Sequence, residues 1–158
     1  MRIAIDLAVI HGMRTGVGNY AYNLLRALAK VDCINEYTVF LNSANHEEFS
    51  LGKPNFREVL VALPLRGLLW TEHLYFAGAG LDRFDVVHVV MGTGPFLGGG
   101  RRVITVYDAA LSLGFKTAAL RHKLYWTRLF PFWARRADCL SACGICVRIT
   151  PTDNPRNL

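Results

Sequence analysis

The sequence predicts an α/β fold built on a doubly wound, mostly parallel sheet. Two observations carry this prediction. Short apolar or β-branched segments of strand length recur along the chain, and segments whose apolar residues have helical spacing lie between them. No apolar run approaches the roughly 18 residues that cross a bilayer. The 52% of hydrophobic residues are therefore expected to form a core, and 158 residues have room for one domain of typical size.

The first expected unit is a strand followed by an amphipathic helix. Residues 2–10 read RIAIDLAVI, an apolar run that is typical of a buried parallel strand. Between Thr15 and Val31 the apolar residues instead recur at helical spacing, with polar residues on the opposite side. This change of period predicts a helix that lies on the sheet.

The remaining elements continue the alternation. Strands are predicted over 37–41, 57–63, 86–90 and 102–107, and helices over 68–79 and 117–137. Pro131 is expected to kink the last helix. Another strand is due after Asp138, but the sequence there contains three cysteines and ends in a polar, proline-containing segment. We therefore place the domain at 1–138 and expect an atypical, partly disordered tail over 139–158.

Charge is distributed unevenly along the chain. Residues 1–100 contain eight Lys and Arg against nine Asp and Glu, whereas residues 101–158 contain ten against three. The basic C-terminal part suits acidic lipid head groups, nucleic acid or a phosphorylated substrate, and it equally suits a solvated helix face.

A glycine-containing segment joins the first expected strand to the first helix. It includes Gly16, Val17, Gly18 and Asn19. Glycines allow close approach of a ligand, and the N–H groups of a helix N-terminus bind anions such as a diphosphate. The spacing differs from the Gly-x-Gly-x-x-Gly dinucleotide fingerprint, so a tight strand-to-helix turn is the alternative interpretation.

Three other candidate site residues stand at the carboxyl ends of expected strands. They are His88, Tyr107 and Asp108. In a parallel sheet these ends share one edge with the glycine segment. A histidine there can act as acid or base, and an aspartate can bind a sugar hydroxyl. The alternatives are a half-buried histidine with a structural hydrogen bond and an aspartate that caps a turn.

The cysteines near the C-terminus have a spacing that iron–sulfur proteins use. Cys139, Cys143 and Cys146 match the three-cysteine pattern of radical S-adenosylmethionine enzymes. Only twelve residues follow Cys146, too few to enclose a cluster and its cofactor. We therefore expect reduced thiols rather than disulfides, and no metal.

Several segments resemble the N-terminal domain of family 4 glycosyltransferases, which are retaining enzymes of the GT-B fold. The resemblance covers about the first 138 residues and is carried by these segments: MRIAIDLAVIHGMRTGVGNYAYNLLRALAK, NEYTVFLN, LLWTEHLYF, DVVHV, RRVITVYDAALSL and LYWTRLFPFWARRAD. It implies a Rossmann-like, acceptor-side domain and transfer of a sugar from a nucleotide-sugar donor to a hydroxyl. The family makes polysaccharides and glycolipids without a metal cofactor.

The resemblance also assigns roles to residues. Gly16 and Gly18 match the family's glycine loop near the donor diphosphate and the acceptor, and Asp108 matches an acid in the cleft. The chain has Tyr107 where the family usually has histidine, and it lacks the donor-binding domain with its paired glutamates. We therefore expect a truncated form that is inactive alone.

The implied partners are a nucleotide sugar and a glycan or lipid-linked acceptor. A lipid-linked acceptor favours contact of the basic C-terminal half with a membrane surface over nucleic-acid binding. The expected location is cytoplasmic, with peripheral contact at the inner membrane face. Two alternatives stay open: a non-catalytic binding module or remnant, and an unrelated Rossmann-like nucleotide-binding protein.

Overall fold

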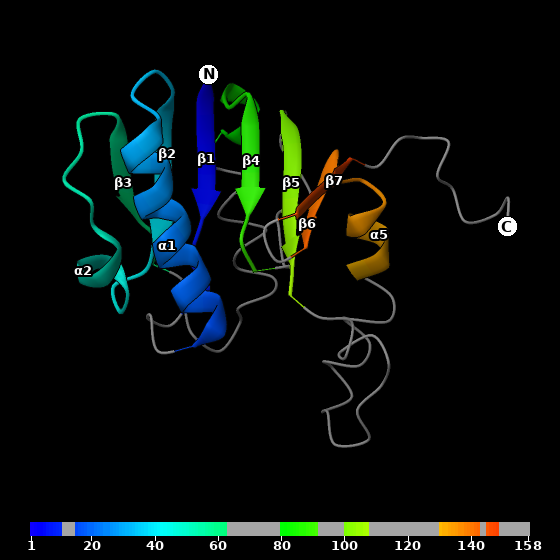
Figure 1. Cartoon of the computed structure of the whole chain (residues 1–158), viewed down its shortest axis with the longest axis horizontal. Helices are drawn as coiled ribbons and strands as arrows, with labels where there is room; N and C mark the ends of the chain where they lie inside the picture. The colour runs from blue at the N-terminus through cyan, green and yellow to red at the C-terminus, as the bar shows by residue number, and fades with distance from the viewer. Residues whose placement is uncertain (11–14, 63–79, 92–99, 108–129, 143–144, 149–158) are drawn as a thin grey trace, which may run out of the picture.

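Seven strands form a single sheet in the order β3-β2-β1-β4-β5-β6-β7 (Figure 1). The computed structural model describes residues 1–10, 15–62, 80–91, 100–107, 130–142 and 145–148, with no side-chain description for Trp133 or 145–148. Strands β1 to β6 pair in parallel, and β7 pairs with β6 in the antiparallel direction. The predicted α/β fold with a Rossmann-like, mostly parallel sheet is confirmed.

The described elements have the following bounds. The strands are β1 (Arg2–Asp6), β2 (Glu36–Leu41), β3 (Phe56–Leu60), β4 (Val86–Val89), β5 (Arg101–Val106), β6 (Cys139–Ala142) and β7 (Ile145–Arg148). The helices are α1 (Gly16–Val31), α2 (His46–Phe49), the 3-10 helix η1 (Leu81–Arg83) and α5 (Phe130–Ala134). The helix predicted over 68–79 and residues 117–129 of the last predicted helix lie outside the described residues. Pro131 lies within α5, which ends at Ala134 rather than at residue 137.

The strand order contains a change of direction between β1 and β4. The chain proceeds from β1 through β2 to β3 on one side, then returns to place β4 on the other side of β1 and continues outward to β5 and β6. Because these six strands are parallel, their carboxyl ends meet at one edge, which is the lower edge in Figure 1. In open α/β sheets, ligands bind outside the carboxyl ends of strands at such a switch point.

Two apolar cores lie on the two faces of the sheet. On the α1 face, Leu25 of α1 and Phe49 of α2 pack with Ile5, Val39 and other side chains of β1 and β2. On the opposite face, Phe40, Val87 and Ile104 pack together, with Phe130 of α5 beside them. The alternation of side chains along each parallel strand thus buries both faces, as a doubly wound sheet requires.

Two predicted boundaries are corrected by the structure. The first strand ends at Asp6 rather than at Ile10. The carbonyl groups of Leu7, Ala8 and Ile10 accept hydrogen bonds from asparagine side chains instead of from a neighbouring strand. The sheet also extends past residue 138. β6 continues the parallel order and β7 folds back against it, so residues 139–142 and 145–148 of the expected tail belong to the sheet.

Aspartates hold the amino edge of the sheet. Asp85, directly before β4, accepts a hydrogen bond from the Arg2 N–H at 2.6 Å. Asp138, directly before β6, accepts one from the Arg102 N–H at 2.7 Å. In both pairs the aspartate N–H also donates to the carbonyl of the same arginine. The same two hydrogen bonds therefore set where β4 begins beside β1 and where β6 begins beside β5.

A third aspartate closes the connection between α1 and β2. The Asp32 carboxylate accepts hydrogen bonds from the Asn35 side-chain amide at 2.6 Å and the Tyr37 hydroxyl at 2.7 Å. The bond from Asn35 is the main reason that the pKa of Asp32 lies well below its ordinary value, and the bond from Tyr37 adds to the effect. Burial, together with the Asp32 carboxylate, raises the pKa of Tyr37 to about 12.

Gly100 makes the start of β5 possible. Its φ is +80°, in the left-handed region, and a Cβ atom at this position would lie 2.3 Å from the Phe84 carbonyl oxygen. The Arg101 N–H then donates to the Asp85 carbonyl at 2.9 Å, so β5 joins β4 directly after this glycine. No residue with a side chain could make this approach without displacing the backbone.

Candidate functional site

Helix α1 begins at the carboxyl edge, beside the switch point between β1 and β4 (Figure 1). Thr15 is its N-cap, and the Thr15 hydroxyl accepts a hydrogen bond from the Gly18 N–H at 3.0 Å. The Asn19 N–H donates to the Thr15 carbonyl at 2.9 Å. Of the four predicted ligand-binding residues, Gly18 and Asn19 thus use their N–H groups within the helix. The N–H groups of Gly16 and Val17, at the first helical positions, are the ones that face out of the helix end.

Gly16 is exposed, and a Cβ atom built there would have no heavy atom within 4 Å. Gly18 is buried against the rest of the domain. The two predicted glycines therefore differ in what they can do. Gly16 leaves open space at the end of the helix, whereas Gly18 helps the first turn of α1 pack.

Two asparagines hold the segment that leads from β1 toward α1. The side-chain amide of Asn45 donates to the carbonyls of Leu7 at 2.9 Å and Ile10 at 2.7 Å. The amide of Asn42 donates to the carbonyls of Ala8 at 2.8 Å and Ile10 at 2.9 Å. Asn45 is fully buried, so these bonds replace the water that the carbonyl groups would otherwise bind.

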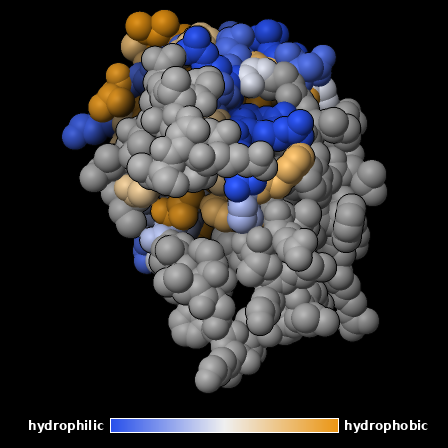
Figure 2. All heavy atoms as spheres, turned by 90° about the vertical axis from the view of Figure 1, so that its right-hand side faces the viewer, coloured by the Kyte–Doolittle hydropathy of each residue, from blue (hydrophilic) through white to orange (hydrophobic). Residues whose placement is uncertain are grey.

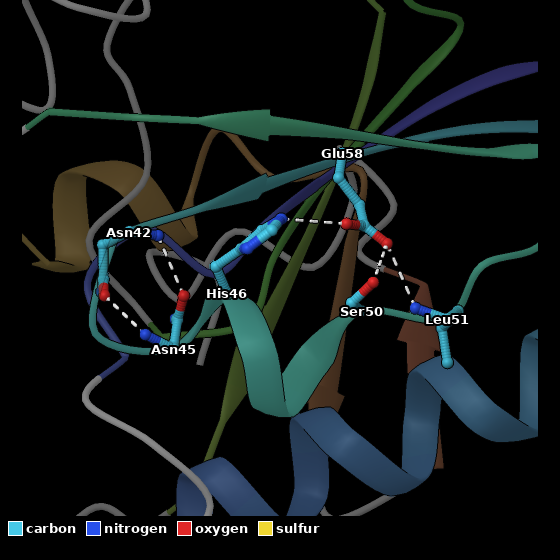
Figure 3. Close-up of polar contacts among 6 residues, drawn as sticks. All are labelled: Asn42, Asn45, His46, Ser50, Leu51 and Glu58. Carbon is cyan, nitrogen blue, oxygen red and sulfur yellow. Dashed lines mark hydrogen bonds and ion pairs between the residues drawn. The ribbon is translucent and has the colours of Figure 1, made fainter.

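Each asparagine also accepts a hydrogen bond from the backbone N–H of the other. The Asn42 N–H donates to the Asn45 side-chain oxygen at 2.9 Å, and the Asn45 N–H donates to the Asn42 side-chain oxygen at 3.0 Å (Figure 3). The same turn starts α2, where Nε2 of His46 lies 3.1 Å from a carboxylate oxygen of Glu58 in β3. The carboxyl edge near β1 is therefore held by side chains from the segment between β2 and α2. No helical periodicity marked this segment in the sequence.

His88 lies on the α1 face of β4, in register with Ile5 of β1 and Val103 of β5. Its Nε2 atom is 2.9 Å from the Thr105 hydroxyl. Removal of the ring from water lowers the pKa of His88 from 6.5 to about 4, so the imidazole is neutral at pH 7. This arrangement matches the structural alternative, a partly buried histidine with a hydrogen-bonded partner. A neutral imidazole still retains the capacity to accept a proton.

Tyr107 follows β5 on the same face. Its ring meets the ring of Tyr20 of α1 edge to face, with centroids 5.5 Å apart, and its hydroxyl oxygen is buried. The contact joins the carboxyl end of β5 to the first turns of α1. Asp108, the third candidate catalytic residue, lies outside the described residues. The structure therefore brings Tyr107 against Tyr20, one residue after the glycine segment. His88 lies on the neighbouring strand β4, in register with Val103, four residues before Tyr107.

A buried carboxylate at the carboxyl end of β1 was not among the predicted site residues. Asp6 is only 2% exposed, and one of its carboxylate oxygens accepts a hydrogen bond from the Ala8 N–H at 3.0 Å. Its position inside an otherwise apolar run is the signal in the sequence that could have identified it. Asp6 helps turn the chain out of β1 at the switch point.

Cysteine chemistry differs from the expectation at one position. Cys33 is a free, exposed thiol. Cys139 is disulfide-bonded rather than reduced. The described part of the chain contains no group of three or more His, Cys, Asp or Glu side chains that could hold a metal ion.

The described surface near α5 carries basic side chains beside apolar ones. The guanidinium of Arg136 lies over the ring of Phe132, 4.6 Å from its centroid, and Phe132 is 43% exposed. Figure 2 views this end of the molecule and shows hydrophilic residues beside hydrophobic ones in its described part. Among the described helices, none has the length and apolar character needed to cross a bilayer.

Comparison with models of protein families found no match for this chain. A comparison with curated proteins also found no matching relative.

Proposed function

We propose that this chain is the acceptor-side, Rossmann-like domain of a family 4 glycosyltransferase of the GT-B fold. In this proposal the family's reaction moves a sugar from a nucleotide-sugar donor to a hydroxyl of a glycan or lipid-linked acceptor. The observation that carries the proposal is the position of α1. Its first turn, with Gly16 exposed and Val17 half-buried, lies beside the switch point of the six parallel strands.

The geometry supports an anionic or hydroxyl-bearing group at this edge. The Gly16 and Val17 N–H groups have no carbonyl one turn earlier in the helix, and a helix N-terminus carries partial positive charge. The Asn42 and Asn45 amides fix the shape of the segment that enters this region. A helix end with free N–H groups, next to a chain segment that is held in one conformation, can bind a phosphate or a sugar hydroxyl with little change of conformation.

Binding by the chain itself tests the proposal. Saturation-transfer-difference NMR of the full chain would use two sets of probes, neutral oligosaccharides and the nucleotide sugars UDP-glucose and GDP-mannose. An acceptor-side domain is expected to bind oligosaccharide and to leave the nucleotide sugars unbound. Binding of the nucleotide sugars alone would instead favour an unrelated nucleotide-binding protein, and binding of neither set would contradict the proposal.

Gly16→Ala locates the binding. The added methyl group meets no heavy atom within 4 Å, and alanine favours helix over glycine by up to about 1 kcal/mol. The variant should therefore keep or gain stability while it loses oligosaccharide binding. Asn23→Ala, at an exposed position farther along α1, is the matched control and should bind as the unmodified chain does. Unchanged binding in Gly16→Ala would remove the first turn of α1 from the site.

A further inference from the structure

A cavity lies at the amino end of the sheet, on the face opposite α1. It has a volume of about 510 Å³. Its described lining includes three arginines that come from separate elements: Arg2 of β1, Arg57 of β3 and Arg83 of η1. Glu36 is the one carboxylate among these lining residues. We call this cavity the arginine pocket.

The strand register explains why these residues meet. Arg2 of β1 pairs with Glu36 of β2, and Thr38, two residues later on the same face of β2, pairs with Arg57 of β3. Since residues two apart on a strand share a face, Arg2, Thr38 and Arg57 lie on the face opposite α1. The fold thus gathers residues that are separated by more than 50 positions in the sequence.

Two aromatic side chains form an apolar floor in the pocket. Phe40 and Phe84 are 3% and 8% exposed, and their rings meet edge to face with centroids 6.2 Å apart. Val59 of β3 extends the apolar lining. A ligand with a ring or another flat apolar part could cover this floor, while a charged part reached the arginines.

The charges of the described lining are not balanced within it. Three guanidinium groups against one carboxylate give a net charge of +2. In the described parts of the chain, the guanidinium groups of Arg2 and Arg57 make no hydrogen bond or ion pair. A phosphate monoester carries about −1.5 to −2 charge at pH 7, which matches this excess, and guanidinium groups bind phosphate oxygens in a bidentate manner.

Arg83 is held in place before any ligand binds. Its Nε atom donates to the Gly80 carbonyl at 3.1 Å, and its guanidinium lies 5.9 Å from the Phe84 ring centroid. Gly80 has φ +64°, a left-handed conformation that favours glycine. The hydrogen bond to the Gly80 carbonyl and the contact with Phe84 hold the arginine along the pocket, which lowers the entropy that a ligand must remove.

We propose that the arginine pocket binds a small phosphate monoester with an aromatic or apolar body. The phosphate would lie among Arg2, Arg57 and Arg83, and the body would lie on Phe40 and Phe84. This site is separate from the carboxyl edge, so it stands whether or not the chain is a glycosyltransferase domain. The volume is larger than a bare phosphate needs and lies within the range of small-molecule sites, roughly 300–1,000 Å³.

Isothermal titration calorimetry of the full chain with phenyl phosphate tests the proposal. Saturable binding of one molecule per chain is expected, with weaker binding of inorganic phosphate and none of phenol. Arg57→Gln should weaken the binding of phenyl phosphate at least tenfold, because it removes one charge-assisted contact at an exposed position of the outer strand β3. Absence of saturable binding to the unmodified chain would overturn the proposal.

A matched control locates the binding of phenyl phosphate. Arg101→Gln makes the same change at an exposed strand arginine that lies on the α1 face, and this variant should bind phenyl phosphate as the unmodified chain does. A loss with Arg101→Gln equal to that with Arg57→Gln would reveal unspecific charge attraction and would overturn the proposal. Should Arg57→Gln fail to fold, Arg2→Gln provides the same test, since the hydrogen bonds between Arg2 and Asp85 use the backbone N–H and carbonyl groups of Arg2, which the substitution keeps.

Discussion

The two edges of the sheet are held by different chemistry. At the amino edge, Asp85 and Asp138 bind backbone N–H groups of the neighbouring strands, and a glycine at position 100 allows two segments to touch. At the carboxyl edge near β1, Asn42 and Asn45 bind backbone carbonyls of a loop. The amino-edge contacts start strands, whereas the carboxyl-edge contacts shape a connection. Residues 7–10, which lead toward the candidate site, are therefore a fixed part of the scaffold.

The largest loss of stability is expected for a substitution at the amino edge. Gly100→Ala combines a left-handed φ with an overlap between the new Cβ and the Phe84 carbonyl oxygen, so it should lower the free energy of unfolding by about 4 kcal/mol. Gly52→Ala is the matched control, because its φ is +58° but no heavy atom lies within 4 Å of the new methyl group. It should cost only about 1 kcal/mol. Urea denaturation measures both, and equal losses would show that the close approach at residue 100 is unimportant.

At the carboxyl edge, Asn45→Ala removes the donors to the carbonyls of Leu7 and Ile10 in a fully buried place. Buried acceptors left without partners, together with a small cavity, should lower the free energy of unfolding by about 3 kcal/mol. Asn23→Ala, which removes one exposed bond to the Asn19 carbonyl, should cost about 0.5 kcal/mol or less. Urea denaturation of the two variants gives the comparison. A small loss in Asn45→Ala would mean that water replaces the asparagine and that the loop is not fixed.

The smallest effect concerns His88, which lies between the two edges. Its pKa is about 4 in the folded chain and 6.5 ordinarily, so the unfolded chain binds more protons between these values. Stability should therefore fall as the pH is lowered through this window, by about 2 kcal/mol between pH 7 and pH 5. His88→Gln should remove this part of the pH dependence. Thr105→Val should retain it, because burial rather than the Thr105 hydrogen bond lowers the pKa; a flat profile in Thr105→Val would reverse that assignment.

The parts of the fold that depend on local pattern could be predicted from the sequence. Apolar runs identified the core strands, and the change of period at Thr15 identified α1. The end of β1 was predicted wrongly because residues 7–10 remain apolar, while the side chains that bind their carbonyls follow about 35 positions later. Helix α2 has only four residues, too few to show periodicity. Non-local hydrogen bonds and very short helices leave no local signal.

The candidate site was predictable to a similar degree. The location of the glycine segment beside the switch point follows from a parallel sheet, and Gly16 and Val17 lie there at the start of α1. Their role in ligand binding stays a prediction. The use of the Gly18 N–H by Thr15 could have been inferred from the capping preference of threonine. The arginine pocket could not have been inferred, because Arg2, Arg57 and Arg83 come together only once the register between three strands is known.

The bonds from Asn42 and Asn45 have a practical use in protein engineering. They end at Ile10, so within the described residues the path of the chain after β1 is held by side chains of the segment that follows β2. Thr15, on the other side, starts α1 through its bonds to Gly18 and Asn19. The two anchor points make the intervening segment a suitable position for loop grafting, in which sequences of different length are exchanged while the sheet and α1 stay unchanged.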